Sequence, residues 1–562
     1  MNMNIVESAT SPIEQIISKA LEASTSSPYA ALETEVLNAL STTKENSQKE
    51  YLYYIKKLTE NNNAISTETL NNLVNCHAPE TNTNSQSSTE KLIKIATEQA
   101  ELFSDTSSDN KAFTVVKKDL HNEIYSLASN HFKEWLSYTY YQEHKKVPND
   151  KSLKDVLGTL KGLAKYKGNE YPVYLRCAQN PEKDGYVIDL CNDTWQVVEI
   201  TKHGWKTLNH SPVKFTRNAN MASLPNPISG GYLTDLWAFV NIAKEDRKLV
   251  LVWILECFRP DTPFPLLEIG GQQGSAKSST QSYLRELIDP SRPNLRASPK
   301  TDEDIFVSAK GNWLVSYNNL SHLKSSRQDT LCTLATGGGF SRRKLYTDDE
   351  EIVWECKRPV VINGISKLVT APDLLDRTIS IELPIIKKFV NESDLRSSFE
   401  SKRSAIFGAL LDLFVDALNH LPTVNIEKNI RMTDFTDFGE AVYRSLGEAE
   451  GSFLIAYDDR RKASIAQSIE SSPIASAISL FAQSSTHSQS LGYHGTIGEL
   501  FTTMEEYRPK GDSSWPKSAK GLSDALKRFS PALQMVGVNI EFKRRSSQGR
   551  GIHIWYEKAN QI

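Results

Sequence analysis

The pattern of apolar and polar positions changes several times along the chain and predicts regions of different structure. From 1 to 110, short apolar stripes recur at helical spacing, as at Ile13, Ile16 and Ile17, in a polar background without a single glycine. The pattern predicts a helical, polar and partly flexible N-terminal extension with linkers near 80–90 and 105–110. Two interpretations of this extension remain: a mobile tail, or a module for oligomerisation or partner docking.

Alternating apolar runs separated by turn residues predict β structure between 111 and 230. A helical stretch near 120–141 precedes five such runs, YPVYLRC, GYVIDL, WQVVEI, GWKTL and VKF. We therefore expect an α+β domain with an antiparallel meander over 111–230. Asp189 and Asp193 could be metal ligands, but the favoured interpretation is that they are carboxylates in solvated turns.

A short apolar strand at 265–269 runs into a glycine-rich turn and then into a helix-forming segment, in the order PFPLLEIGGQQGSAKSSTQSYLRELI. A phosphate-binding loop needs this context, because small residues let backbone N–H groups converge on phosphates at a helix N-terminus. Lys277 is expected to contact the β- and γ-phosphates of ATP, and Ser278 to ligate Mg²⁺. Ala276 replaces the glycine of the general pattern, which is the mildest change available. The nucleotide-binding candidates are Gly271, Gln272, Gln273, Gly274, Ser275, Ala276, Lys277, Ser278 and Ser279.

Two further apolar strands are predicted to end in amides. NWLVSYNNL ends in Asn318 and Asn319, where P-loop ATPases place the acid that organises Mg²⁺. An amide can hold a metal-bound water, so Ser278 and Asn318 form the predicted metal site. It cannot supply a negative charge or accept a proton, which leaves ATP hydrolysis in question. RPVVI ends at Asn363, which could orient the attacking water.

An arginine precedes the β-like run TISIELP in the segment DLLDRTISIELP. Arg377 could act as an arginine finger across a subunit interface. An ordinary ion pair with Asp373 or Asp376 is the alternative.

Together these segments resemble the bacterial and phage ATP-binding proteins related to superfamily 3 helicases and to phage or plasmid primase-helicase ATPases. The resemblance spans about 111–440 and rests on GGQQGSAKSST, NNLS, CTLATGGGFSRRKLYTDDEE, RPVVINGI, DLLDRTISIELP, PVKFTR, SLPNPISGGYLTDL and RMTDF. It implies a multidomain α/β protein with an AAA+-like P-loop ATPase core at 231–395, and a homo-oligomer, with a hexamer as one option. It matches Asn363 and Arg377 to family positions, and Asn318 to a position that usually holds Asp.

In related helicases, the motif matched by Gly337–Lys344 forms a loop in the central channel of a ring and grips single-stranded DNA. The resemblance therefore implies DNA contacts by Phe340, Arg342, Arg343 and Lys344. Cations on a glycine hinge suit a phosphate track, and an aromatic ring can stack on a base. A solvated loop balanced by the acids at 348–351 is the alternative.

The remaining chain is predicted to form a helical lid at 396–470 and, after the polar junction SIESSPIASA, a winged helix at 478–562. TIGELFTTMEEY and WPKSAKGLSDALKRFSPAL supply helices, and VNIEFKRR with GIHIWYE supplies a hairpin. From 515 to 562 there are nine basic and three acidic residues, a local charge of +6. This suits contact with duplex DNA, although such folds also serve as protein adaptors. The candidates are Lys520, Lys527, Arg528, Lys543, Arg544, Arg545 and Arg550.

Composition excludes several classes of protein. The chain has 562 residues and a net charge of −3, so a uniformly basic nucleic-acid-binding protein is excluded, although local patches are not. Its six cysteines lie far apart without a C-x-x-C pair, which argues against a zinc cage or a disulfide framework. The apolar run at 249–255 is too short to span a bilayer, and the first residues lack a signal-peptide pattern. We expect a cytoplasmic protein with no membrane partner.

The leading hypothesis is an ATP-dependent, oligomeric, helicase-like ATPase that binds DNA in replication or processing of a mobile element or phage-related locus. The alternative is an ATP-gated DNA-binding switch or scaffold with slow or no hydrolysis, in regulation or defence. A small-molecule kinase would leave the basic loop and the C-terminal region unexplained.

Overall fold

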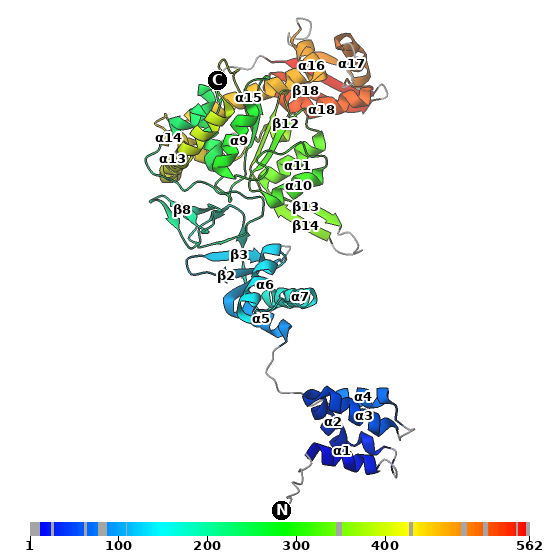
Figure 1. Cartoon of the computed structure of the whole chain (residues 1–562). Coiled ribbons are helices and arrows are strands. Elements are labelled where there is room, and N and C mark those ends of the chain that lie inside the picture. Colours follow the sequence, from blue (N-terminus) through cyan, green and yellow to red (C-terminus); the bar gives the residue numbers. More distant parts are fainter. Residues whose placement is uncertain are drawn as a thin grey trace, which may run out of the picture. The chain divides into compact units, whose positions relative to one another are not determined.

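The protein is a multidomain α/β molecule that divides into two units, Met1–Ser87 and Ser88–Ile562 (Figure 1). Its computed structural model describes residues 12–23, 27, 29–60, 65–76, 87–107, 110–343, 351–425, 431–484, 492–509, 515–546 and 549–557. At 340–343, 351–354 and 545–546 only the backbone is described.

The first unit is a group of helices with an apolar core of its own. The predicted stripes face inward, since Ile17, Leu40 and Leu70 are completely buried. The sequence suggested loosely joined helices, whereas these helices share one core. They are α1 (Pro12–Ala23), η1 (Ala30–Leu32), α2 (Thr34–Asn46), α3 (Gln48–Glu60) and α4 (Thr67–Cys76).

The second unit begins at Ser88, not at the predicted boundary near 110. Its first strand pairs antiparallel with β2 and parallel with β4, in the sheet order β3-β2-β1-β4. Phe103 in this strand is completely buried, although the sequence pattern assigned it to the polar N-terminal extension. The elements are α5 (Ser88–Gln99), β1 (Ala100–Asp105), β2 (Ala112–Lys117), β3 (Asn122–Ser126), α6 (Asn130–His144), α7 (Asp150–Tyr166) and β4 (Asn169–Tyr171).

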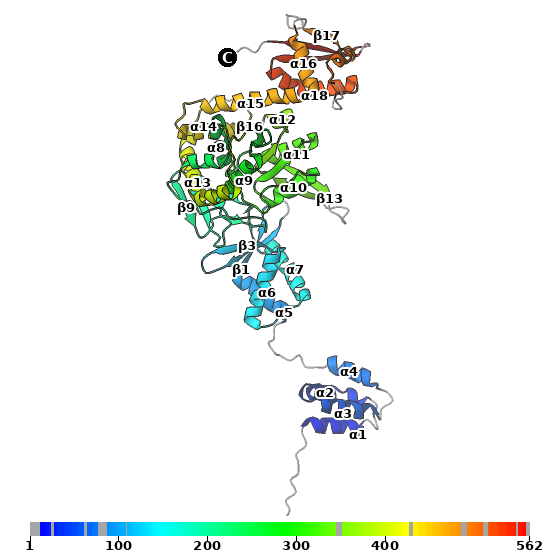
Figure 2. The same cartoon turned by 45° about the horizontal axis from the view of Figure 1, so that its top comes forward.

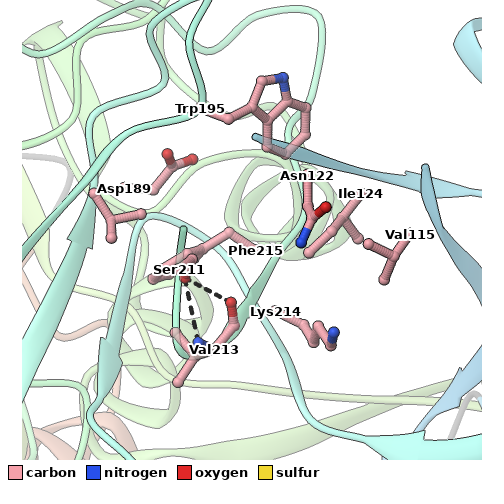
Figure 3. Close-up of a pocket in the computed structure, with 10 residues that line it drawn as sticks. Val115, Asn122, Ile124, Asp189, Trp195, Ser211, Val213, Lys214 and Phe215 are labelled. Atoms are coloured by element: carbon pink, nitrogen blue, oxygen red, sulfur yellow. Dashed lines mark hydrogen bonds between the residues drawn. The ribbon is translucent and has the colours of Figure 1, made fainter. Parts of the chain in front are cut away.

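The alternating runs that follow form an antiparallel meander in the order β6-β7-β8-β9. Asp189, at the end of β7, is not a solvated turn carboxylate. It is buried and forms an ion pair with Arg217, whose guanidinium lies over the Trp195 ring. Asp189 and Trp195 line a small cavity that β2 and β3 also border (Figure 3). The strands are β5 (Val173–Tyr174), β6 (Cys177–Gln179), β7 (Gly185–Asp189), β8 (Val197–Thr201), β9 (Gly204–Leu208) and β10 (Lys214–Phe215).

The centre of the second unit is a parallel sheet in the order β12-β15-β11-β16. Because all four strands run in one direction, their carboxyl ends meet at one edge, where ligands of such sheets bind. The strands are β11 (Leu266–Gly270), β12 (Val315–Leu320), β15 (Val360–Gly364) and β16 (Thr378–Glu382). Around them lie η2 (Leu233–Ala238), η3 (Lys244–Asp246), α8 (Arg247–Glu256), α9 (Lys277–Ile288), α10 (Asp302–Gly311), α11 (Ser325–Thr336) and α12 (Pro372–Leu375).

Three long helices follow the sheet, namely α13 (Glu392–His420), α14 (Thr433–Ser445) and α15 (Ser452–Ser471), with η4 (Leu421–Thr423) between the first two. Within the described residues, only the segment Glu392–Thr423 is long and apolar enough to cross a membrane. Half of it is buried, and Phe407, Leu410 and Phe414 belong to the largest apolar core. Packing against that core accounts for its apolar character.

Helix α15 continues from the parallel-sheet core into the C-terminal module, as Figure 2 shows. Phe453 near its start belongs to the central core, and Ile469 near its end to the C-terminal core. The predicted polar junction at 468–477 is therefore helical and largely buried. The module contains α16 (Pro473–Gln483), β17 (Tyr493–Thr496), α17 (Ile497–Met504), η5 (Glu505–Tyr507), α18 (Ala519–Met535), β18 (Val538–Ser546) and β19 (Gly549–Tyr556), with the sheet order β17-β19-β18.

A buried ion pair joins the meander to the parallel sheet. The Arg176 side chain is completely buried, and its Nε lies 2.9 Å from Asp289 Oδ1. The other oxygen, Asp289 Oδ2, accepts the backbone N–H groups of Trp313 at 2.9 Å and Leu314 at 3.0 Å. Burial opposes the charge of Arg176, but Asp289 outweighs it and raises the pKa of Arg176. One carboxylate thus fixes the meander, the end of α9 and the start of β12.

Replacement of Asp289 by alanine should therefore destabilise the second unit strongly. Asp289→Ala leaves the Arg176 charge buried without its partner, which should lower the free energy of unfolding by about 3–5 kcal/mol. Asp235→Ala is the control, because Asp235 pairs with Lys402 at the surface and should matter by less than about 1 kcal/mol. Denaturant-induced unfolding measures both variants. An Asp289→Ala loss no larger than the control would contradict this account.

Candidate functional site

The loop at 271–276 follows β11 and leads directly into α9. Three of its residues have left-handed backbone angles, with φ values of 138° at Gly271, 84° at Gly274 and 56° at Ala276. Ala276 caps α9 in this conformation, which is unfavourable for a residue with a Cβ atom. The sequence suggested a mild replacement of glycine, whereas the structure places the extra methyl group on a strained backbone.

Lys277 folds back over this loop. Its Nζ donates to the carbonyl oxygens of Gly271 at 2.6 Å and Gln272 at 2.8 Å. Partial burial lowers the pKa of the ammonium group, and the Glu382 carboxylate opposes that shift. The Lys277 ammonium is therefore bonded to loop carbonyls. It would have to leave them to bind a phosphate in the loop.

The predicted Ser278, Asn318 and Asn363 side chains meet at the carboxyl edge of the sheet. Asn318 Oδ1 accepts from Ser278 Oγ at 2.7 Å and from Asn363 Nδ2 at 2.7 Å. Asn363 Oδ1 in turn accepts the backbone N–H of Asn319 at 2.7 Å. Neighbouring parallel strands β12 and β15 end side by side, and α9 begins beside them, so these residues come together from three elements.

Ser278 and Asn318 present two oxygens that suit Mg²⁺. The two oxygen atoms lie 2.7 Å apart. Adjacent oxygen ligands of an octahedral Mg²⁺ with Mg–O distances of 2.0–2.1 Å are about 2.9 Å apart, so the two distances are similar. Among the described residues, no three His, Cys, Asp or Glu side chains gather where they could hold a metal. Magnesium would therefore need the phosphates of a nucleotide to complete its shell.

Two amides that the sequence did not single out hold this arrangement together. Gln281 is completely buried on α9, where its Nε2 donates to Ser316 Oγ at 2.8 Å and its Oε1 accepts from Asn363. Asn241 Nδ2 donates to the carbonyl oxygens of Ser275 at 3.0 Å and Pro384 at 2.6 Å. Gln281 follows Lys277 by one helical turn, and this polar residue on an inward-facing position was the available signal.

A carboxylate also lies beside the loop, on the far side of β11 from Asn318. Glu382 pairs with Gly270 across the two strands, and a Cβ atom at Gly270 would lie 2.3 Å from Glu382 Oε1. A side chain at this point of β11 would therefore require the flexible Glu382 side chain to move. Burial raises the pKa of Glu382, and the Glu268 carboxylate adds to that effect.

Arg377 lies at the opposite edge of the sheet from the loop. It immediately precedes Thr378, which pairs with Leu266 at the start of β11, whereas the loop leaves the other end of β11. At about 3.3 Å per strand residue, the two points are about 16 Å apart. Arg377 therefore cannot reach a phosphate bound in the loop of its own chain.

The alternative prediction for Arg377 was an ion pair with Asp373 or Asp376. The described residues show neither ion pair. Asp373 pairs with Arg431 at 2.8 Å, and Asp376 pairs with Arg461 at 2.8 Å. The Arg377 guanidinium instead contacts the Cys332 thiol and the Asp373 carbonyl. Its charge is not matched by a described carboxylate.

The predicted channel loop is a β-hairpin. Phe340, Arg342 and Arg343 lie on β13 (Gly338–Arg343), which pairs antiparallel with β14 (Glu351–Cys356) and projects beside α10 and α11 (Figure 1). Phe340 is opposite Trp354, and Arg343 is opposite Glu351. Alternating bulky residues such as Trp354 and Ile352 explain the strands. Lys344 and the acids at 348–350 lie outside the described residues.

The cationic candidates of the C-terminal module lie on α18 and on the β18–β19 hairpin. Lys520, Lys527 and Arg528 are exposed on α18, and Lys543 and Arg544 are exposed on β18. The Lys527 ammonium and the Arg550 guanidinium both lie near the Phe542 ring, at 5.9 and 5.5 Å from its centroid. Only the backbone of Arg545 is described. Helix and hairpin thus contribute cations to one module.

Two family models match the chain. Residues 232–457 match the replication protein of actinomycete integrative conjugative elements, and residues 474–561 match the RepA C-terminal domain of the same elements. These matches support a replication protein family and a function in DNA replication. No curated protein matches the chain.

Solved structures with low sequence identity also align with the chain. The apo structure of the NrS-1 C-terminal region (305–718) is 12% identical, with 84% of this chain and 100% of that chain covered and a TM-score of 0.37. The X-ray structure of JCV helicase is 12% identical, with 41% of this chain and 64% of that chain covered and a TM-score of 0.21.

The strain at Ala276 predicts that glycine stabilises the loop. Ala276→Gly removes the Cβ atom from a left-handed residue and should raise the free energy of unfolding by about 1 kcal/mol. Ala456→Gly in α15 is the control and should lower it by about 1 kcal/mol, because that residue is helical. Thermal unfolding compares the two. Equal destabilisation by both would show that Ala276 carries no strain.

Proposed function

We propose that this chain, which matches replication-protein models over both its nucleotide core and its C-terminal module, is a helicase-like, oligomeric ATPase acting on DNA in the replication of a mobile element. It works in the cytoplasm, where that DNA is. The convergence of Ser278, Asn318 and Asn363 beside the 271–276 loop, at the carboxyl edge of a parallel sheet, carries the proposal.

ATP and Mg²⁺ occupy this edge in the proposal, with the P-loop of an AAA+-like, superfamily 3 helicase-like core. The backbone N–H groups of Gly271 to Ser279 surround the phosphates, and Lys277 leaves its loop carbonyls to contact them. Ser278 and Asn318 hold Mg²⁺, which neutralises phosphate charge. Asn363 orients the attacking water, and its own orientation is set by the bonds to Gln281 and to the Asn319 N–H.

The nucleotide site lies between two subunits in this proposal. Arg377 is about 16 Å from the loop of its own chain, and no described carboxylate neutralises it. It therefore serves the nucleotide of a neighbour as an arginine finger. A homo-oligomer, with a hexameric ring as one arrangement, supplies the necessary interface.

DNA binds at two places in the proposal. The projecting β13–β14 hairpin, with Phe340, Arg342 and Arg343 on β13, grips a single strand in the channel. The C-terminal module, with the order α16, β17, α17, α18, β18, β19, is a winged helix that binds duplex DNA. The exposed cations of α18 and β18 face the phosphates there.

Mixed oligomers test the shared site. Lys277→Ala should abolish ATP turnover and strand displacement, and Arg377→Ala should reduce turnover by on the order of 10³-fold or more. A mixture of the two variants should recover part of both activities, because some interfaces then join an intact Lys277 to an intact Arg377. Phosphate release and displacement of a labelled strand are the measurements.

Unwinding by Lys277→Ala at the wild-type rate, or no unwinding by wild type on any DNA substrate, would rule out the motor. Failure of the mixture to recover activity, with both single variants inactive, would place Arg377 outside the shared site.

The second candidate function is an ATP-gated DNA-binding switch or scaffold. The amides of Asn318 and Asn319 favour it, because neither supplies a negative charge or accepts a proton. Nucleotide would then be held for long periods and would select one conformation of the DNA-binding surfaces.

Introduction of a carboxylate at Asn318 separates the two functions. Asn318→Asp keeps both accepted hydrogen bonds, from Ser278 and Asn363, so the fold should be retained. For a switch, ATP turnover should rise at least about tenfold; for a motor it should stay near the wild-type rate. Phosphate release with and without single-stranded DNA measures this, and Asn319→Asp, at the exposed neighbour, is the matched control. Strong DNA-stimulated turnover in wild type would exclude the switch.

A further inference from the structure

A column of three stacked aromatic rings lies on the C-terminal sheet. His494 on β17 is opposite His553 on β19, and their ring centroids are 3.8 Å apart with planes 12° from parallel. Trp555 continues the column, with its ring 4.5 Å from His553 and inclined by 22°. The spacing and the small angles are those of stacked aromatic systems, as in nucleic acids.

These rings are on the face of the sheet that does not pack on the helices. Strand residues alternate, so Ile552 and Ile554 enter the C-terminal core, whereas His553 and Trp555 point to the other side. His494 is exposed, and His553 and Trp555 are partly exposed. Hydrophobic packing within the module therefore does not account for the column.

The two ends of the column are His494 and Trp555. Among the described residues, no further aromatic ring stacks on His494 or Trp555. Gly492 lies beside the column, where a Cβ atom would be 2.7 Å from the Trp555 Cβ atom and 3.0 Å from His553 Nε2. The Trp555 indole N–H donates to Glu557 at 3.0 Å, which fixes the ring plane.

Exposed cations lie a short way along the sheet from the column. A Cβ atom at Gly551, two residues along β19 from His553, would be 3.2 Å from the Lys543 Cβ atom, and both Lys543 and Arg544 are exposed. Glu541 is opposite His553, with 3.9 Å between its carboxylate and His553 Nδ1. A ligand with flat rings and a negative backbone therefore complements this face better than an apolar peptide does.

We propose that this column is a binding site for unpaired bases of a single-stranded nucleic acid. A base stacks on the outer face of Trp555 or His494, and Lys543 and Arg544 contact the neighbouring phosphates. A base pair inside a duplex is already stacked on both faces, so the site selects single strands. The inference rests on the proposed function for its ligand class, DNA, and adds a second contact for the separated strand.

Binding of three labelled ligands to the full chain tests the site. The ligands are an oligothymidylate, an abasic oligonucleotide of the same length, and a duplex of that length, all without ATP. Trp555→Ala should weaken oligothymidylate binding about fivefold or more and leave the other two ligands within about twofold, because only the first offers an unpaired base. Trp555→Phe should restore most of the affinity, whereas Lys543→Ala should weaken all three.

The measurements are made with Arg342→Ala and Arg343→Ala also present, so that the hairpin does not mask the second contact. Photocrosslinking of a strand that contains 5-iodouracil should label His494 or Trp555. Unchanged oligothymidylate binding in Trp555→Ala, or an equal loss on all three ligands, would overturn the proposal. Because no ATP is added, the result does not depend on whether the chain is a motor.

Discussion

The position of α9 against β12 is the constraint on which the nucleotide edge depends. The helix starts at the carboxyl edge of the sheet and returns to the other edge, while β12 runs the opposite way. Asp289 fastens the end of α9 to the backbone N–H groups that precede β12, and Arg176 pairs with the same carboxylate. Near its start, Ser278 and Gln281 fasten the helix to Asn318 and Ser316. The attachments at the two ends of α9 therefore fix the distance between the 271–276 loop and the end of β12.

The attachment near the start of α9 is made by amides rather than carboxylates, and this affects the electrostatics of the edge. Buried Asn363 and Gln281 satisfy each other without bringing a charge into the sheet, so the edge stays ordered without a cation. A carboxylate at Asn318 would accept the same two hydrogen bonds but would need a counter-charge in the absence of magnesium. The negative groups nearby, Glu268 and Glu382, lie on other strands, and Glu268 is held by Lys367. The hydrogen-bond network at the strand ends is thus neutral, while Lys277 and Glu382 are the charged groups beside the loop.

The sequence predicted local features well where chemistry and periodicity coincide. The strand, loop and helix around Lys277 were expected, and Asn318 and Asn363 were each expected at the end of a strand, but their direct hydrogen bond was not predicted. Gln281 and Asn241 were missed because their roles arise from contacts between segments 34 to 143 residues apart. Phe103 was missed because it lies before the boundary predicted near 110, in a region that is polar as a whole. The serine-rich 468–477 segment looked like a linker, although its alanines and isoleucines are buried. Pattern alone does not show which face of a short element finds a partner.

The two edges of the parallel sheet differ in the charged groups that they carry. The carboxyl edge collects neutral donors and acceptors around the 271–276 loop, while the other edge carries Arg377, whose neighbouring aspartates are occupied by Arg431 and Arg461. Such an arrangement costs little when the arginine is at the surface and becomes useful only when a second chain brings an anion to it. A single chain would then hold two halves of different sites. In the proposed assembly, each chain brings its Arg377 to the nucleotide bound at the carboxyl edge of its neighbour, so that each chain completes the site of the next.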